Sequence, residues 1–146
     1  MGYRINEMLD TMKFHHIGVA VKEIEKTAAV YVQGGYKQSV TTFDPVQQVN
    51  VCWLTKEGMP TVELVEPVDD SSPVCKTLAK TGVTTYHTCY RVEDIEKAIT
   101  ELRKMRYVVV VEPVEAPAIM NSKVSFLYNK HVGLIELVEA PAEITF

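Results

Sequence analysis

The sequence predicts an α+β fold in which two tandem β-α-β-β-β modules share one curved mixed sheet. The first observation is a repeat, because His16 lies in a β-rich run and His87 lies in a second such run 71 residues later. An Ile-Glu-Lys triplet that begins the following helix recurs at the same spacing. A later strand also recurs, since Val-Glu-Leu-Val-Glu at 62–66 is matched by Ile-Glu-Leu-Val-Glu at 135–139. Constant spacing over a strand, a turn and a helix start indicates one supersecondary unit used twice.

The composition indicates a folded protein and argues against several classes of function. Of the 146 residues, 47% are hydrophobic, which is enough for the core of one domain or of two small ones. The net charge of −4 and the lack of a Lys/Arg run argue against nucleic acid as a partner. The longest apolar run, residues 107–111, is too short to span a bilayer, and residues 1–12 carry no signal-peptide core. Cys52, Cys75 and Cys89 have no C-x-x-C spacing, so we expect buried, reduced thiols in a cytoplasmic protein.

The first module is predicted at residues 13–67 and opens with a strand at 13–21. Even positions of this strand place His16 beside small residues on one face, which leaves room above the sheet. Odd positions form a mostly aliphatic face that suits packing on a helix, and His15 is expected on that helix side or at a dimer contact. A helix follows at 23–33, because apolar residues recur there at three- and four-residue spacing and two glycines come next.

Three more strands complete the first module. They are rich in β-branched or aromatic residues and are bounded by turn residues. Asp44-Pro45 forms the turn after the first of them, residues 56–60 form a hairpin loop, and Pro67 ends the last one. The expected strands are residues 36–43, 49–55 and 61–66.

A helical linker at 68–83 joins this module to the second, which spans residues 84–139. Ser72 and Pro73 begin the linker helix, as a capping residue and as the first helical position. The second module repeats the order of the first, with a strand at 84–92, a helix at 94–105, and strands at 107–112, 123–128 and 133–138. A proline-containing loop is expected at 113–121, and residues 1–12 and 140–146 form a lead-in and a tail.

Two glutamates within apolar strands, Glu63 and Glu136, require an explanation. Burying a carboxylate without a partner costs several kcal/mol or forces it to become neutral, roughly as for any isolated buried charge. His16 and His87 lie in the same repeat register, and we expect all four side chains on the inner face of one curved sheet. Two imidazoles and two carboxylates suit a divalent transition metal whose remaining positions take substrate oxygens. The four residues therefore predict a metal-binding cleft.

Each of these residues also has a simpler interpretation. A single histidine in a strand is more often structural than a ligand, and a single glutamate is usually solvated. His131 is read as a turn residue, and Glu66 and Glu139 as solvated side chains at strand ends. Arg91 falls on the ligand side, where it would bind a substrate anion or lie exposed at the strand end, and Asn50 is a second candidate substrate-binding residue.

With these motifs the chain resembles the vicinal oxygen chelate superfamily, which includes glyoxalases, bleomycin resistance proteins and dioxygenases. Within it, the chain is most similar to methylmalonyl-CoA epimerase-like proteins, over nearly all of residues 13–139. The matching segments are residues 15–21, 62–67, 70–74, 86–87, 123–127 and 134–137.

The resemblance implies an enzyme that binds one divalent ion per chain, Zn, Ni, Co, Mn or Fe. The ligands carried over are His16, Glu63, His87 and Glu136. The ion acts as a Lewis acid on a carbonyl oxygen of a small acyl substrate, an enolate forms, and Glu136 is the catalytic base. A homodimer is also implied.

Two segments depart from the epimerase pattern. A second acid/base group is expected near residues 49–53, yet the polar side chains there are Gln47, Gln48 and Asn50, and the nearest carboxylate is Asp44. The glycine-rich segment that lies along the thioester in the epimerases is replaced by the stiffer residues 115–122. A lactoylglutathione lyase of the glyoxalase I type and a non-catalytic, antibiotic-resistance-type binding protein are the alternatives.

Overall fold

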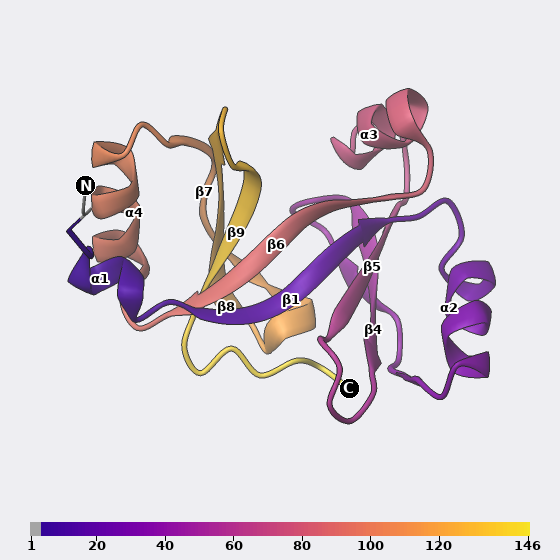
Figure 1. The fold of residues 1–146 in the computed structure, drawn as a ribbon. Helices are drawn as coiled ribbons and strands as arrows, with labels where there is room; N and C mark the ends of the chain where they lie inside the picture. The colour runs from indigo at the N-terminus through magenta and orange to yellow at the C-terminus, as the bar shows by residue number, and fades with distance from the viewer. Residues whose placement is uncertain (1–3) are drawn as a thin grey trace.

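The computed structural model describes residues 4–146, and residues 1–3 of the predicted lead-in lie outside the described residues. The described chain forms a mixed sheet of nine strands, with helices at its two ends and along its edge (Figure 1). In chain order the elements are α1 (Glu7–Asp10), β1 (Lys13–Ala20), α2 (Ile24–Gln33), β2 (Lys37–Gln38), β3 (Thr42–Asp44), β4 (Val49–Thr55), β5 (Val62–Pro67), α3 (Val74–Thr81), β6 (Thr84–Val92), α4 (Ile95–Lys104), β7 (Val108–Ala116), the 3-10 helix η1 (Pro117–Ile119), β8 (Ser122–Asn129) and β9 (Gly133–Glu139).

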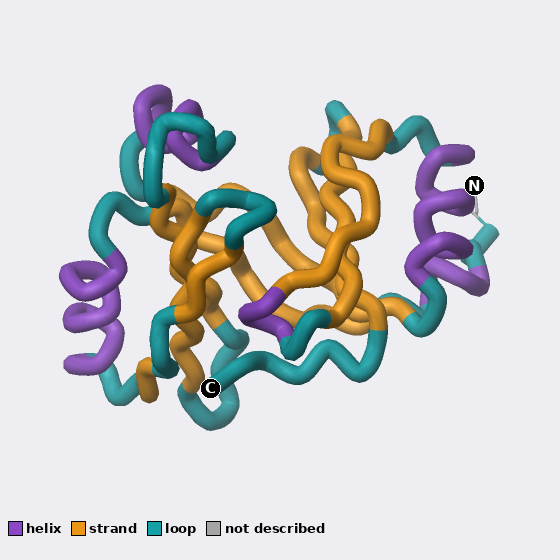
Figure 2. The backbone as a smooth tube through the Cα atoms, turned by 180° about the vertical axis from the view of Figure 1, so that it is seen from behind, coloured by secondary structure: helices purple, strands orange, loops and turns teal. Residues whose placement is uncertain are grey.

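The sheet confirms the two β-α-β-β-β modules. Its strand order is β2-β4-β5-β1-β6-β9-β8-β7, with β3 paired on β4. The first strands of the modules, β1 and β6, run antiparallel side by side across the middle of the molecule (Figure 1). Each of them pairs in parallel with the last strand of its own module, β5 or β9. Figure 2 shows the two groups of strands from behind, with η1 lying between them.

Three apolar clusters stabilise this arrangement. One lies between α2 and the outer face of the first module, and a second lies between α4 and the outer face of the second module. The buried positions of α4, Ile95, Ala98, Ile99 and Leu102, follow the spacing of one helix face. The third cluster lies on the inner face and includes Trp53, which is fully buried. The helices α2 and α4 therefore cover the outside of the sheet, whereas Val74 of α3 and Ala118 and Ile119 of η1 pack in the inner-face cluster.

The structure corrects two of the predicted segments. The predicted strand at 36–43 is two short strands, β2 and β3, which pair with different parts of β4. The predicted loop at 113–121 is instead the end of β7 followed by η1. Pro113 is tolerated within β7 because β7 is an edge strand and its pairing with β8 is irregular between Val111 and Val114.

Three other expectations concern the cysteines, the lead-in and membrane-spanning segments. Cys52 and Cys89 are buried free thiols, whereas Cys75 in α3 is only partly buried. The lead-in contains the short helix α1, which packs against α4. No helix among residues 4–146 is long and apolar enough to cross a membrane.

Glu66 and Glu139 were predicted to be solvated, but the structure shows that both make hydrogen bonds to a helix. A carboxylate oxygen of Glu66 accepts a hydrogen bond of 2.9 Å from the backbone N–H of Ile24, and Glu139 accepts one of 3.0 Å from Ile95. Ile24 and Ile95 are the first residues of α2 and α4, and the N–H groups of the first turn of a helix have no partner within the helix. The last strand of each module therefore anchors the helix that follows the first strand.

We predict that Glu66→Ala and Glu139→Ala each lower the free energy of unfolding by about 1 kcal/mol, the usual value of a helix N-terminal cap. Chemical denaturation monitored by circular dichroism measures this change. Glu57→Ala in the exposed loop between β4 and β5 is the matched control. A loss no larger than that of the control contradicts the anchoring role.

Candidate metal centre

The four predicted ligands converge at one point on the inner face of the sheet. His16, Glu63, His87 and Glu136 come from β1, β5, β6 and β9, which are adjacent in the order β5-β1-β6-β9. The Nε2 atoms of the two histidines are 3.2 Å apart. Oε1 of Glu63 is 3.3 Å from each of these nitrogens, and Oε1 of Glu136 is 3.1 Å from His16 and 3.2 Å from His87. All four residues are buried.

The arrangement fits a divalent ion. One nitrogen or oxygen atom from each residue lies within 4.8 Å of the others, which is the spacing of atoms that surround one cation. Oε1 of Glu136 is buried and has no hydrogen-bond partner among the described residues, although it lies between two imidazoles. A buried polar atom without a partner is costly. Two imidazole nitrogens and two carboxylate oxygens form a donor set that suits Mn, Fe, Co, Ni or Zn.

Electrostatics in the cluster favour charged side chains. Burial alone raises the pKa of Glu63, but the charge of His16 and hydrogen bonds from both imidazoles outweigh it and lower the pKa. The pKa of Glu136 is likewise lowered, because the adjacent imidazoles of His16 and His87 outweigh burial. Burial disfavours a charged His16, but Cys89 and the carboxylates raise its pKa well above 6.5. Burial also lowers the pKa of His87, but Glu136 and Glu63 outweigh it, so that the pKa of His87 is raised as well. Without an ion, protons on the histidines balance the two carboxylates.

Gly18 provides the space in which His87 lies. A Cβ atom built on Gly18 would be 2.0 Å from Cε1 of His87, far inside van der Waals contact. Gly18 pairs with His87 across β1 and β6, so the imidazole lies directly over the glycine. This glycine therefore determines where one of the four donor atoms can be placed.

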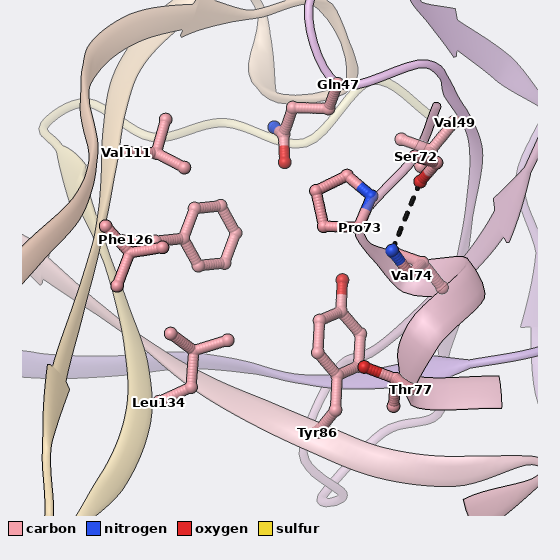
Figure 3. Close-up of a pocket in the computed structure, with 11 residues that line it drawn as sticks. Gln47, Val49, Ser72, Pro73, Val74, Thr77, Tyr86, Val111, Phe126 and Leu134 are labelled. Carbon is pink, nitrogen blue, oxygen red and sulfur yellow. Dashed lines mark hydrogen bonds between the residues drawn. The ribbon is translucent and has the colours of Figure 1, made fainter. Parts of the chain in front are cut away.

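A small cavity is lined by Glu63 and Glu136, and it shares Gln47, Val49, Tyr86 and Phe126 with a larger cavity. The small cavity, of about 20 Å³, is large enough for about one water molecule, and Asp44, Gln47, Glu63, Tyr86 and Glu136 contribute to its wall. The larger cavity, of about 110 Å³, has a mostly apolar wall. Figure 3 shows the Tyr86 hydroxyl and the Gln47 amide pointing into it, between Phe126 and Pro73. The site thus has a polar inner end and an apolar outer part.

Asn50 and Arg91, the two predicted substrate-binding residues, line neither cavity. Asn50 lies between Val49 and Val51, which face inward, and its side-chain amide donates to Glu66 at 3.2 Å. Its role is therefore on the outer face, which corrects the prediction. Arg91 is partly buried towards the end of β6, where it pairs with Lys13 and Val138.

Other residues also have different positions from those expected. His15 was expected on the helix side or at a dimer contact, but its ring lies against those of His16 and Trp53. His131 is in an exposed turn, as predicted. Gln47, Tyr86 and Asp44 line the cavities and were not among the predicted site residues. The repeat could have drawn attention to Tyr86, because it lies 71 residues after His15.

Comparison with known proteins agrees with this geometry. Residues 15–126 match the family model of the glyoxalase/bleomycin resistance protein/dioxygenase superfamily. The chain is 30% identical over 132 residues to the mitochondrial methylmalonyl-CoA epimerase of Homo sapiens, covering 88% of this chain and 74% of that protein. It is similar to the crystal structure of methylmalonyl-CoA epimerase from Mycobacterium tuberculosis, with a TM-score of 0.78, 27% identity and 87% of each chain covered. A methylmalonyl-CoA epimerase in complex with methylmalonyl-CoA and NH4+ gives a TM-score of 0.77 and 27% identity, with 91% of this chain and 98% of that one covered.

We predict that Gly18→Ala lowers the affinity for a divalent ion by at least about tenfold, the lower end for changes that disturb ligand orientation. The added methyl group cannot share space with the His87 ring, so the ring must move. Competition titration with a chromogenic chelator measures the affinity. Gly34→Ala, at the end of α2, is the control and keeps the wild-type affinity. Unchanged binding by the Gly18 variant shows that His87 is not a ligand.

We also predict opposite pH dependences for the metal-free and metal-loaded proteins. The raised pKa values of His16 and His87 give the metal-free protein stability that is complete below pH 6.5 and lost as pH rises through the folded-state values. The lowered values of Glu63 and Glu136 give stability that is present above pH 4.5 and lost as pH falls. An ion needs neutral imidazoles, so its affinity rises with pH.

The difference in Tm between the loaded and metal-free proteins should therefore grow from about pH 6 to about pH 8, because metal binding releases protons in this range. Differential scanning calorimetry at fixed free metal concentration measures it. A difference that stays constant over this range contradicts histidine ligation.

Proposed function

The chain belongs to the glyoxalase/bleomycin resistance protein/dioxygenase superfamily, and we propose that it is a metal-dependent epimerase acting on small acyl thioesters. The observation that carries the proposal is the convergence of two imidazoles and two carboxylates beside a cavity that also contains Asp44. Similarity to methylmalonyl-CoA epimerases supports the same reaction class. An epimerase removes a proton from the carbon next to a carbonyl and returns one from the opposite side.

His16, Glu63, His87 and Glu136 would hold one divalent ion. Bound there, the ion supplies Lewis acidity toward a carbonyl oxygen and so stabilises an enolate of the substrate. Two anionic and two neutral donors leave the site electrically balanced when the histidines lose their protons. The donor set does not select among Zn, Ni, Co, Mn and Fe.

Glu136 is proposed as the base on one side of the substrate. Its Oε1 atom is buried between the imidazoles, while the residue also contributes to the wall of the small cavity. A carboxylate with one oxygen toward the ligand cluster has a second oxygen available for proton transfer. Bound beside a divalent ion, the carboxylate would be ionised, which is the form that can accept a proton.

Asp44 is proposed as the acid/base group on the other side. It is buried and lines the same small cavity as Glu63 and Glu136, but it comes from β3 of the first module, whereas Glu136 comes from β9 of the second. Oδ1 accepts backbone N–H groups of Val46 and Gln47 at 2.9 and 3.0 Å, which fixes the carboxylate. Within residues 4–146, Oδ2 accepts only from the Gln47 amide, at 3.3 Å, and it is the oxygen proposed to exchange a proton with substrate.

The larger cavity is proposed to hold the acyl group. Its wall is built mainly from apolar side chains, including Val74, Phe126 and Leu134. Burial and the nearby carboxylates raise the pKa of Tyr86, so its hydroxyl stays protonated and can donate to a substrate oxygen. The Gln47 amide offers a donor and an acceptor in the same space.

The two alternatives are less well supported. A glyoxalase I-type enzyme would use the same four ligands but would need cations for the carboxylates of glutathione, and no Lys or Arg among the described residues lines either cavity. A non-catalytic binding protein has no need of four buried metal-ligating side chains, which this chain retains. Assembly as a homodimer and a cytoplasmic location are further proposals that rest on the sequence.

We predict that metal-loaded protein incorporates deuterium from D2O into the α-carbon of methylmalonyl-CoA and interconverts its epimers. Asp44→Asn should slow interconversion by about 10²- to 10⁴-fold, the usual contribution of general acid–base catalysis, while exchange into one epimer continues from Glu136. Mass spectrometry and chiral chromatography of the hydrolysed acyl group measure the two rates.

Asp69→Asn is the matched control for this variant. Asp69 also accepts a backbone N–H two residues further on, from Ser71, but it is exposed and lines neither cavity among the described residues. A wild-type rate of interconversion in Asp44→Asn excludes Asp44 as the second acid/base group. Absence of deuterium exchange with all five metals excludes the proposed epimerase activity.

A further inference from the structure

The central pairing of β1 and β6 is interrupted at two places that correspond in the two modules. Phe14 pairs with Tyr90 and His16 with Cys89, so His15 is an extra residue on β1. Gly18 pairs with His87 and Val19 with Thr85, so Tyr86 is an extra residue on β6. His15 and Tyr86 are 71 residues apart and each precedes a predicted ligand. A bulge redirects the side chain of the extra residue, which explains why His15 does not follow the alternation of its strand.

His15 links the ligand His16 to the C-terminal tail. Its Nδ1 atom is 2.7 Å from Nδ1 of His16, and its Nε2 atom is 2.7 Å from the carbonyl oxygen of Ala142. A carbonyl oxygen only accepts, so Nε2 of His15 must carry the proton. In a neutral imidazole the other nitrogen is then an acceptor, and Nδ1 of His16 must donate to it. Nε2 of His16 is the nitrogen that points at the other three ligands.

We propose that His15 is a positioning residue that fixes His16 in the tautomer whose Nε2 lone pair binds the metal. This inference deepens the proposed function and rests on its four-residue metal site. Ligating histidines generally donate their second ring N–H to a nearby acceptor, which sets both tautomer and orientation. Here the acceptor is a second histidine, and that histidine is itself set by a backbone carbonyl.

The tail is held in the position that this chain of hydrogen bonds requires. Ala142 is buried and has a φ of 58°, a left-handed conformation that an L-residue adopts only at a cost. Three residues later, Thr145 bonds through its N–H to the carbonyl of Ala118 and through its hydroxyl to the carbonyl of Pro117. The tail therefore connects His15 to η1, whose residues Ala118 and Ile119 form part of the small cavity wall.

Trp53 restrains the same pair of rings from the side. Its indole N–H donates to the carbonyl of Ala118 at 2.9 Å, so the tail and the indole are anchored to one segment. The ring centroid of Trp53 is 4.9 Å from that of His16 and 6.2 Å from that of His15, in edge-to-face geometry. Neither imidazole can rotate freely while the indole is in place.

The second module has no equivalent connection. Tyr86 occupies the position of His15, with its ring centroid 4.4 Å from that of His87, but Nδ1 of His87 has no hydrogen-bond partner among the described residues. On the Nδ1 side, the His87 ring is held by packing against Phe126 and Gly18. Among the described residues, the chain of hydrogen bonds behind the ligand therefore exists for His16 and not for His87.

Cys89 is the competing partner for His16. A nitrogen of His15, a nitrogen of His16 and the sulfur of Cys89 lie within 4.8 Å of one another. A thiol is a weak acceptor, and the imidazole nitrogen at 2.7 Å is a stronger one. The same three atoms are also candidate ligands for a second ion. Substitution of His15 distinguishes a ligand role of His15 from a positioning role.

Three substitutions of His15 test the proposal. His15→Asn keeps an oxygen acceptor where Nδ1 stood, His15→Gln keeps a polar group only where Nε2 stood, and His15→Ala keeps neither. Titration of Zn and Ni against a competing chelator should give a 10- to 100-fold lower affinity for the Ala and Gln variants, as for other residues that orient ligands. The Asn variant should retain most of the wild-type affinity, and His131→Ala, which removes an exposed histidine, should retain all of it.

Several results would overturn the proposal. Equal losses in the Asn and Ala variants assign the effect to packing rather than to the acceptor, and wild-type affinity in all three variants removes any role for His15. Two ions per wild-type chain, with one lost in His15→Ala, make His15 a ligand instead. In metal-free protein, long-range ¹H–¹⁵N NMR should find the His15 proton on Nε2 with Nδ1 bare. That measurement stands even if the wild type binds no metal, which would refute the proposed function separately.

Discussion

Two carboxylates and two imidazoles buried against one another constrain the whole molecule. Glu63 and Glu136 cannot be buried alone, and His16 and His87 are the groups that compensate them. These side chains come from four adjacent strands, so the centre of the sheet must keep its register to within one residue. Gly18 and the bulges in β1 and β6 are the local adjustments that allow the rings to meet. Apolar side chains in place of the two histidines would leave the charges of the two carboxylates uncompensated.

The two modules supply equivalent candidate ligands but different surroundings. Each places a histidine on its first strand and a glutamate on its last, and each anchors its long helix with a second glutamate from that last strand. The differences lie around this symmetric centre. His15, Asp44 and Gln47 belong to the first module, whereas η1 belongs to the second and the tail follows it. Epimerisation needs a proton-transfer group on each side of the substrate carbon, and the two groups proposed here, Asp44 and Glu136, come from different modules.

The modules and the convergence of the four candidate ligands could be predicted from the sequence, because both rest on a repeat of constant spacing. The outward position of Asn50 follows from strand alternation, because Asn50 lies between Val49 and Val51, which face inward. The bulge at His15 could not be predicted, because it arises from pairing with a strand about 75 residues away rather than from local preference. The bonds from Glu66 and Glu139 to helices also join residues 42 and 44 positions apart.

The most direct test of the account is a crystal structure of the metal-loaded protein with anomalous scattering data collected at the absorption edge of the metal. The account predicts one anomalous peak per chain, within bonding distance of Nε2 of His16, Nε2 of His87 and the carboxylates of Glu63 and Glu136. A peak at any other position, or a peak bonded to His15 and Cys89 instead, contradicts the four-residue centre on which the proposed chemistry depends.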